Sequence, residues 1–384
     1  MIRDFSPTIM DNKFEKILLY LFMVGFVSSA LTTVSFDSFS RGVTFYFDGL
    51  LAIYAVRVMF KFRMSTFQCS VIACSLVYVI YYFVSFIYSP HDTGWYFVIQ
   101  SLKIFFYLPI FVMFYRVKLF NKNEFQRFYN FLLFSFAVKY SVLIVLGYDR
   151  PMLLVENNYE LLMLIMFYAF ISVYYTKNVK LSLMLYFVVF VSGSRSALVT
   201  LMAVEFILNS KRIDFMFFIK SIIGLICLYI AQLVFISRMG ELSIDEIDRV
   251  RFFLYFLNEL KNYDFYNLLF GVHSYVPLDS DTCFDLKFYK SFFDKNTGDC
   301  YSSIFHAFNI RIIYDHGLLV MVVYFIVLIK VLFDNLESRS LILSLFTSIF
   351  LNGMSVSSLN NFYAVFPICV ILLVNLSEGK YDSQ

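Results

Sequence analysis

A short polar turn, Val-Ser-Gly-Ser-Arg-Ser-Ala-Leu at residues 191–198, interrupts a long apolar part of the chain. Gly193 allows a tight reversal, and the serines around it can cap the helix that follows. Arg195 then lies at a helix N-terminus, where free backbone N–H groups already attract anions. The turn therefore predicts either an anion-binding site or a capped interfacial turn whose arginine contacts lipid headgroups.

A long polar stretch begins at Arg238 and carries further cations. From residue 244 its apolar residues recur at helical spacing, which predicts an amphipathic surface helix with its apolar face inward. Arg249 and Arg251 lie on the flanks of this helix, about 200° apart, because each residue turns a helix by about 100°. One of them can therefore face a given site, and the alternative for both is a solvated polar face.

The same stretch ends in a segment that carries a histidine, an asparagine and an arginine. His306 is the best-placed titratable group for proton transfer, although a lone histidine near an interface is more often structural. Helical spacing predicts that His306 and Asn309 share one face, and that Arg311 and Asp315 share another. Asp315 and the histidine after it are expected to serve packing or ion pairing.

Two lysines, Lys103 and Lys139, fall well inside apolar runs, where a charge is costly. Both are expected at a similar depth on adjacent antiparallel segments, so an anion between them would relieve their repulsion. They predict a site for a phosphate group or an acidic sugar. The alternative is that both side chains extend outward along their methylene stems.

The elements that position these residues are membrane-spanning helices. The chain has 384 residues, of which 60% are apolar, 21% aromatic and only 15% charged, whereas a soluble chain is about 25% charged. Apolar runs bounded by charges predict about twelve spans in an all-α integral membrane protein. These are 17–35, 43–60, 66–89, 95–115, 125–147, 157–176, 181–193, 195–209, 214–237, 308–330, 340–354 and 360–376.

The basic residues predict how these spans are oriented. With the N-terminus in the cytoplasm, every inside loop has at least two Lys or Arg, and no short outside loop has more than one. Both termini are therefore expected to be cytoplasmic. The chain divides into spans one to nine (1–237), a large periplasmic loop (238–307), and spans ten to twelve with the C-terminal tail (308–384).

Several classes of function are excluded. The sequence has no phosphate-cradling glycine loop, nothing suggests a nucleic-acid partner, and no inside loop is long enough for a cytoplasmic ATPase. Cys283 and Cys300 are the two cysteines of the outside loop, and their spacing is no metal signature. An oxidising periplasm would permit a disulfide between them, and two free thiols are the alternative. No metal or cofactor is expected.

Three motifs, in this order and topology, resemble the Wzy-type O-antigen polymerases and the related O-antigen ligases. In that superfamily a Ser-Arg turn followed by small and apolar residues opens a span, as the turn at Arg195 does here. A periplasmic helix then carries an arginine, an aromatic four residues later and a glycine turn, matched by Arg251, Tyr255 and Gly271. Finally, a histidine precedes a glycine at the start of a span, as in His306 and Gly317.

The resemblance implies a GT-C-like glycosyltransferase of the bacterial inner membrane. Its substrates would be oligosaccharide units linked to undecaprenyl pyrophosphate, presented at the periplasmic face. A hydroxyl of the acceptor unit attacks the anomeric carbon of the donor chain, and undecaprenyl pyrophosphate leaves. The catalytic residues implied are Arg195 and Arg251 at the pyrophosphate and His306 at the acceptor hydroxyl. Further candidates for substrate contacts are Lys103, Lys139, Arg238, Arg249, Asn309 and Arg311.

Two rival functions remain open. The ligase pattern prefers Asn, Gln or Ser where this chain has Ala307, and a small residue or Tyr where it has Val320, which counts against a ligase. A lipid-linked oligosaccharide flippase should have short outer loops, yet Lys103 and Lys139 would suit its central cavity. The sequence does not indicate the sugars or the general base, and it leaves open whether a chain-length regulator binds the outer face.

Overall fold

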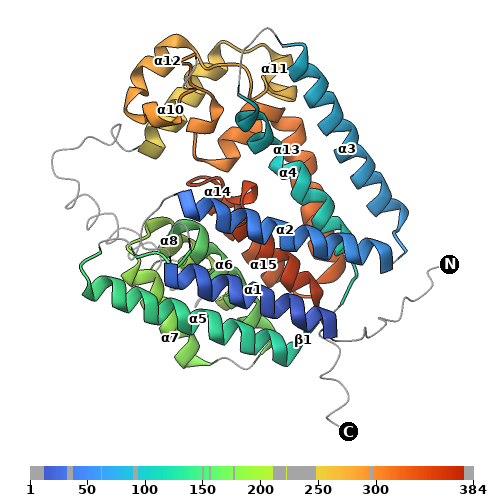
Figure 1. Ribbon diagram of the computed structural model, residues 1–384, viewed down its shortest axis with the longest axis vertical. Helices are drawn as coiled ribbons and strands as arrows, with labels where there is room; N and C mark the ends of the chain where they lie inside the picture. The colour runs from blue at the N-terminus through green and yellow to red at the C-terminus, as the bar shows by residue number, and fades with distance from the viewer. Residues whose placement is uncertain are drawn as a thin grey trace.

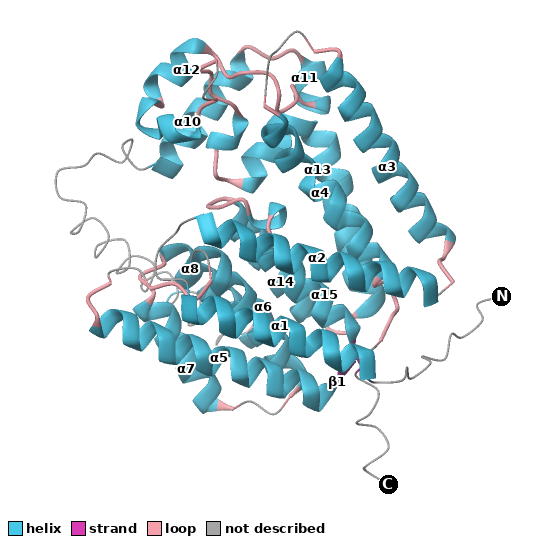
Figure 2. Ribbon diagram, viewed as in Figure 1, coloured by secondary structure: helices cyan, strands magenta, loops and turns pink. Residues whose placement is uncertain are grey.

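The computed structural model describes residues 13–32, 38–61, 63–89, 94–118, 120–148, 151–154, 157–175, 178–210, 222, 248–294 and 297–375. In these ranges the chain is helical, apart from loops and two strands of two residues each (Figure 2). The predicted span 214–237, except for residue 222, and Arg238 lie outside the described residues.

Each of the other predicted spans forms a helix, which confirms the all-α class. The helices that match them are α1 (Lys13–Thr32), α2 (Ser38–Lys61), α3 (Thr66–Ile87), α4 (Trp95–Met113), α5 (Lys122–Val145), α6 (Asn157–Tyr174), α7 (Val179–Val191), α8 (Arg195–Asn209), α13 (Phe308–Asn335), α14 (Arg339–Gly353) and α15 (Phe362–Leu373). Within the described residues, α3, α4, α5 and α13 are long and apolar enough to cross a membrane. Shorter apolar helices include α7, α14 and α15.

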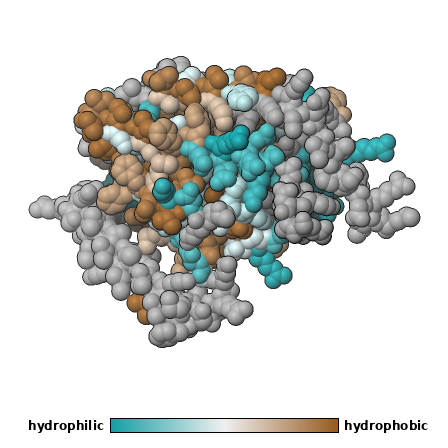
Figure 3. Space-filling view, turned by 90° about the horizontal axis from the view of Figure 1, so that it is seen from below, coloured by the Kyte–Doolittle hydropathy of each residue, from teal (hydrophilic) through white to brown (hydrophobic). Residues whose placement is uncertain are grey.

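The surface of this bundle carries large apolar side chains. Along α3, Leu76, Val77, Ile80 and Ile87 are each more than half exposed, and only 17% of the α3 window is buried inside the protein. Seen from below, hydrophobic side chains cover one flank of the molecule, while hydrophilic ones gather toward the middle (Figure 3). An apolar exterior of this extent is typical of a chain that lies in lipid.

Residues 248–294 and 297–307, which we call the cap, form a compact group of short helices at one end of the bundle (Figure 1). The cap helices are α10 (Asp248–Lys261), α11 (Phe265–Phe270), α12 (Ser280–Asp285), and the 3-10 helices η2 (Lys287–Phe292) and η3 (Ser302–Ile304). Phe252, Phe256 and Phe305 belong to a separate apolar core in the cap, which Ile310 and Tyr314 of α13 complete. A disulfide joins Cys283 to Cys300.

Two glycines attach the cap to α13. The helix changes direction at Gly317, where φ is 86°, and Gly271 at the end of α11 has φ of 80°. A Cβ atom at Gly317 would lie 2.1 Å from the carbonyl oxygen of Leu269, and one at Gly271 would lie 2.6 Å from the backbone nitrogen of His316. Only glycine permits this backbone approach and these φ values. Gly271 of the second motif therefore packs against the backbone of α13 at His316, and Gly317 of the third motif packs against the backbone of α11 at Leu269.

Segments predicted at the same membrane surface contact one another. At the end of the bundle away from the cap, β1 (Phe120–Asn121), from a predicted inside loop, pairs in parallel with β2 (Val374–Asn375), which lies at the inner end of the predicted span 360–376 (Figure 1). At the cap end, the amide of Asn352 donates to the backbone oxygen of Asn158, 3.2 Å away, and each residue lies at the outer end of its predicted span. These contacts agree with the predicted alternation of the spans.

Candidate functional site

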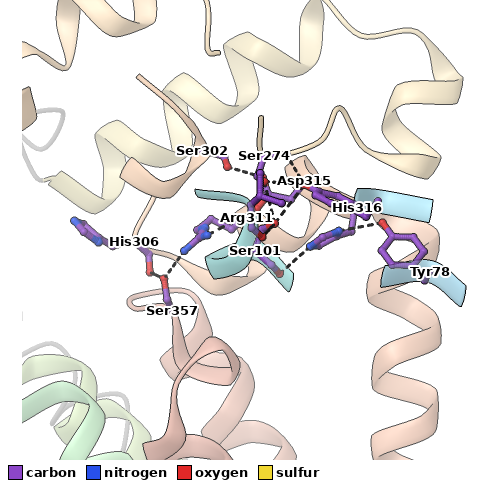
Figure 4. Close-up of polar contacts among 11 residues, drawn as sticks. Tyr78, Ser101, Ser274, Ser302, His306, Arg311, Asp315, His316 and Ser357 are labelled. Atoms are coloured by element: carbon purple, nitrogen blue, oxygen red, sulfur yellow. Dashed lines mark hydrogen bonds and ion pairs between the residues drawn. The ribbon is translucent and has the colours of Figure 1, made fainter. Parts of the chain in front are cut away.

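The His306 segment forms the end of the cap and lies against the loop that joins α14 to α15. Ser357 of that loop donates from its hydroxyl to the backbone oxygen of His306, 2.9 Å away, and the ring of Phe252 lies 5.9 Å from the His306 ring. The half-buried His306 ring points away from Arg311 (Figure 4). The predicted shared helical face with Asn309 is wrong, because α13 begins at Phe308 and His306 precedes it in extended backbone.

Arg311 forms the predicted ion pair with Asp315, one helical turn away. Its Nη2 lies 3.9 Å from an Asp315 carboxylate oxygen, and both side chains are 2% exposed. Ser302 of η3 donates to the same carboxylate (Figure 4). Arg311 Nη1 donates to Ser357 Oγ at 3.5 Å, but Nε and Nη2 have no hydrogen-bond partner. The Asp315 carboxylate therefore offsets the charge of the guanidinium, but two of its three nitrogens lack a hydrogen-bond acceptor.

Serine and asparagine side chains, most of them buried, lie on the elements next to this ion pair. We call these residues, with Arg311, the polar layer: Asn309, Arg311, Asn352, Ser355, Ser357, Ser358 and the partly buried Asn360. They come from the start of α13, the end of α14 and the loop before α15, which includes η4 (Ser358–Asn360). The backbone nitrogen of Phe308 donates to the oxygen of Val356, 3.1 Å away, and holds these elements together.

Most of the polar layer is not among the residues predicted from the sequence. The signal for it is the run Asn-Gly-Met-Ser-Val-Ser-Ser-Leu-Asn-Asn at residues 352–361, which is dense in hydroxyls and amides between two apolar segments. Serine and asparagine also suit an ordinary turn, so this run alone does not indicate a site. Only the fold shows that Asn352, Ser355 and Ser358 are buried rather than exposed to solvent.

The Arg195 turn connects to the polar layer through Asn158. Gly193 adopts φ of 64°, and Ser194 Oγ accepts from the backbone nitrogen of Ala197, as predicted for a tight reversal and a helix cap. The hydroxyls of Ser194 and Ser196 donate to Asn158 Oδ1 at 2.6 and 3.1 Å. Arg195 is exposed at the first residue of α8.

Helix α10 places Arg249 and the motif residue Arg251 on the cap. Arg249 is exposed, whereas Arg251 is half-buried and lowers the pKa of Tyr255, which burial raises above its usual value. Arg251 directly precedes Phe252, the residue whose ring contacts His306. The predicted amphipathic helix is thus present from Asp248, and its predicted start at residue 244 lies outside the described residues.

The two span lysines do not share an anion. Lys103 lies 3.0 Å from the carboxylate of Asp48 on α2, which also accepts from the Tyr107 hydroxyl at 2.6 Å. Lys139 donates to the backbone oxygen of Leu153 at 2.9 Å. Because each lysine has a partner within the protein, these contacts give no support to the predicted phosphate or acidic-sugar site between them.

His316 is structural, as expected. Its Nε2 donates to the backbone oxygen of Ser101 at 3.1 Å. This contact fixes the tautomer, so Nδ1 accepts from the Tyr78 hydroxyl at 3.0 Å (Figure 4). In the cap, His273 packs against the Tyr82 and Tyr275 rings, and burial lowers its pKa.

Among the described residues, no group of three or more His, Cys, Asp or Glu side chains is arranged to hold a metal ion. Comparison of the sequence with protein-family models and with curated proteins yields no match. Of the predicted site residues, His306, Asn309 and Arg311 lie in one short segment, at the end of the cap and the start of α13. Arg251 lies on cap helix α10, next to Phe252, whose ring contacts His306. Arg195 is linked to this segment through Asn158, which contacts Ser194, Ser196 and Asn352.

Proposed function

We propose that the chain is an O-antigen polymerase of the bacterial inner membrane, a glycosyltransferase that joins oligosaccharide units linked to undecaprenyl pyrophosphate. The observation that carries the proposal is the convergence of its three basic motif segments. The Arg195 turn, the Arg251 helix and the His306 segment are far apart in sequence, yet each contacts the polar layer or a residue that does. A reaction between two lipid-linked substrates needs its cationic and proton-accepting groups at one membrane surface.

The proposed topology has about twelve spans, a GT-C-like arrangement, both termini in the cytoplasm and the cap in the periplasm. The four long apolar helices support it, and so do the contacts between segments predicted at the same membrane surface. The bond between Cys283 and Cys300 suits the periplasm, since disulfides persist in oxidising compartments.

The proposed reaction forms one glycosidic bond and breaks one. The oxygen of an acceptor hydroxyl attacks the anomeric carbon of the donor sugar, and the bond from that carbon to undecaprenyl pyrophosphate breaks. The electron pair leaves on a pyrophosphate oxygen, where Arg195 and Arg251 stabilise the developing charge by bidentate hydrogen bonds. His306 accepts the hydroxyl proton, which is released late because such transition states have oxocarbenium character.

Arginine variants test this proposal in cells that lack the chromosomal gene. We expect Arg195→Ala and Arg251→Ala, expressed at wild-type levels, to give lipopolysaccharide with a single repeat unit. Each should lower the polymerisation rate about 100- to 1000-fold, the usual effect of losing one preorganised donor. Lys290→Ala, which removes an exposed cation from the same cap, is the matched control and should give long chains.

Long chains from both arginine variants at the wild-type level would refute the assignment. The deletion strain separates the polymerase from the ligase. Loss of a polymerase leaves one unit attached to the lipid A core, whereas loss of a ligase leaves none attached. Loss of a flippase would also leave none, and lipid-linked units would then accumulate on the cytoplasmic side.

A further inference from the structure

The polar layer contains more buried hydrogen-bonding atoms than the protein itself satisfies. The oxygens Asn309 Oδ1, Asn352 Oδ1, Ser355 Oγ and Ser358 Oγ have no hydrogen-bond partner among the described residues, and neither have Nε and Nη2 of Arg311. All five side chains are at least nine-tenths buried. Buried polar groups in folded proteins are otherwise almost always hydrogen-bonded. A concentration of exceptions on three adjoining elements indicates a place where another molecule supplies the partners.

The chemistry of these atoms suits the hydroxyl groups of a sugar. Amide oxygens accept, the guanidinium donates, and a serine hydroxyl does both, so the layer can bind groups that both donate and accept. Its charge is already balanced, because Asp315 lies 3.9 Å from Arg311. A phosphate in the same place would leave a buried negative charge without a counterion, which is strongly unfavourable. The layer therefore favours an uncharged ligand.

Gly353 packs directly against two side chains of the polar layer. A Cβ atom at this position would lie 2.7 Å from Asn309 Oδ1 and 3.2 Å from Ser358 Oγ. A side chain there would therefore displace two of the unpartnered oxygens. The same layer adjoins the proposed reaction centre, because Ser357 contacts both Arg311 and the backbone of His306.

Resting on the proposed function, we infer that the polar layer is the acceptor subsite, which binds an uncharged sugar of the acceptor oligosaccharide. It is separate from the pyrophosphate site assigned to Arg195 and Arg251. Arg311 then serves as a sugar-binding residue rather than a phosphate ligand. The acceptor unit is held through its hydroxyls, while the donor is held through its diphosphate.

Binding measurements on the full-length protein in nanodiscs test this inference. The probe is the free repeat-unit oligosaccharide, released by mild acid from the lipid-linked intermediate of the host strain and monitored by saturation-transfer NMR. We expect Ser358→Ala and Asn309→Ala each to weaken its binding about 5- to 10-fold, the effect of losing one hydrogen bond. Gly353→Ala should weaken binding by displacing Asn309 Oδ1 and Ser358 Oγ, and Arg195→Ala should leave binding unchanged.

Thermal unfolding separates binding from folding. Ser358→Ala removes an unpartnered buried hydroxyl, so its melting temperature without sugar should equal or exceed that of the wild type. A residue with a merely structural role would instead lower it. Farnesyl pyrophosphate, a soluble stand-in for the donor lipid, should not displace the oligosaccharide.

Oligosaccharide binding that is unchanged in both Ser358→Ala and Asn309→Ala would overturn the inference, and so would displacement by farnesyl pyrophosphate or no binding to the wild type. Because the assay needs no turnover, its outcome is independent of the polymer-length assay on the arginine variants. Loss of the proposed function with sugar binding intact would leave the subsite standing.

Discussion

Removing the carboxylate of Asp315 should destabilise the protein far more than removing the whole ion pair. Asp315 and Arg311 are each 2% exposed at 3.9 Å separation, so Asp315→Leu leaves a guanidinium buried without an anion. Breaking one partner of such a pair typically costs about 3–5 kcal/mol, whereas replacing both by apolar residues is close to neutral. We therefore expect Asp315→Leu to lower the free energy of unfolding by about 3–5 kcal/mol, and Arg311→Met/Asp315→Leu to restore most of it.

The assay is unfolding of the purified protein by SDS in mixed micelles, followed by tyrosine and tryptophan fluorescence. Ser302→Ala is the control for the hydrogen bond that Asp315→Leu also removes, and it should cost about 1 kcal/mol. The rescued double variant should fold yet lose oligosaccharide binding, because it lacks the Arg311 donors. A double variant as unstable as Asp315→Leu would refute the reasoning, since the buried charge could not then be the cause.

Three further predictions follow from the cap and its attachment. Gly317→Ala should abolish detergent-stable protein in fluorescence-detected size-exclusion chromatography, because a Cβ would lie 2.1 Å from the oxygen of Leu269. Cys283→Ser/Cys300→Ser should lower the free energy of unfolding by about 3 kcal/mol, as expected for a short closed loop; an equal melting temperature with and without reductant in the wild type would contradict this. Burial lowers the pKa of His273, so the unfolded chain binds its proton first as pH falls, and stability is lost below about pH 6.5. His273→Asn should therefore show a smaller drop in melting temperature from pH 8 to pH 5 than the wild type does.

The positions of the spans could be predicted because they depend on local composition. An apolar run bounded by charges specifies where a helix begins and ends, and residues 66–89 and 95–115 indeed become α3 and α4 to within two residues at each end. The helix cap at Ser194 and the Arg311–Asp315 pair were predictable for the same reason, since both depend on spacing along one helix.

Partners from distant parts of the chain could not be predicted. Lys103 alone suggests an unpaired cation, because nothing in its own span shows that Asp48 lies 3.0 Å away. Likewise, the Ser- and Asn-rich loop before α15 resembles an ordinary turn until the fold buries it beneath His306 and Arg311. The amphipathic helix at Arg251 was recognised, but its position beside His306 depends on packing within the cap.

The different exposure of the three arginines fits the needs of a repeated transfer reaction. Arg195 is exposed and Arg251 half-buried, so their charges are partly screened by water and ions. In the proposed reaction, a diphosphate held by them would therefore be released after each cycle. Arg311 is buried and its charge is offset by Asp315, so it contributes direction-dependent hydrogen bonds rather than net charge. A polymerase must discharge one lipid diphosphate per added unit while continuing to recognise the same sugars. In the proposed mechanism, weak electrostatic binding of the diphosphate and a neutral site for the sugar would meet both requirements.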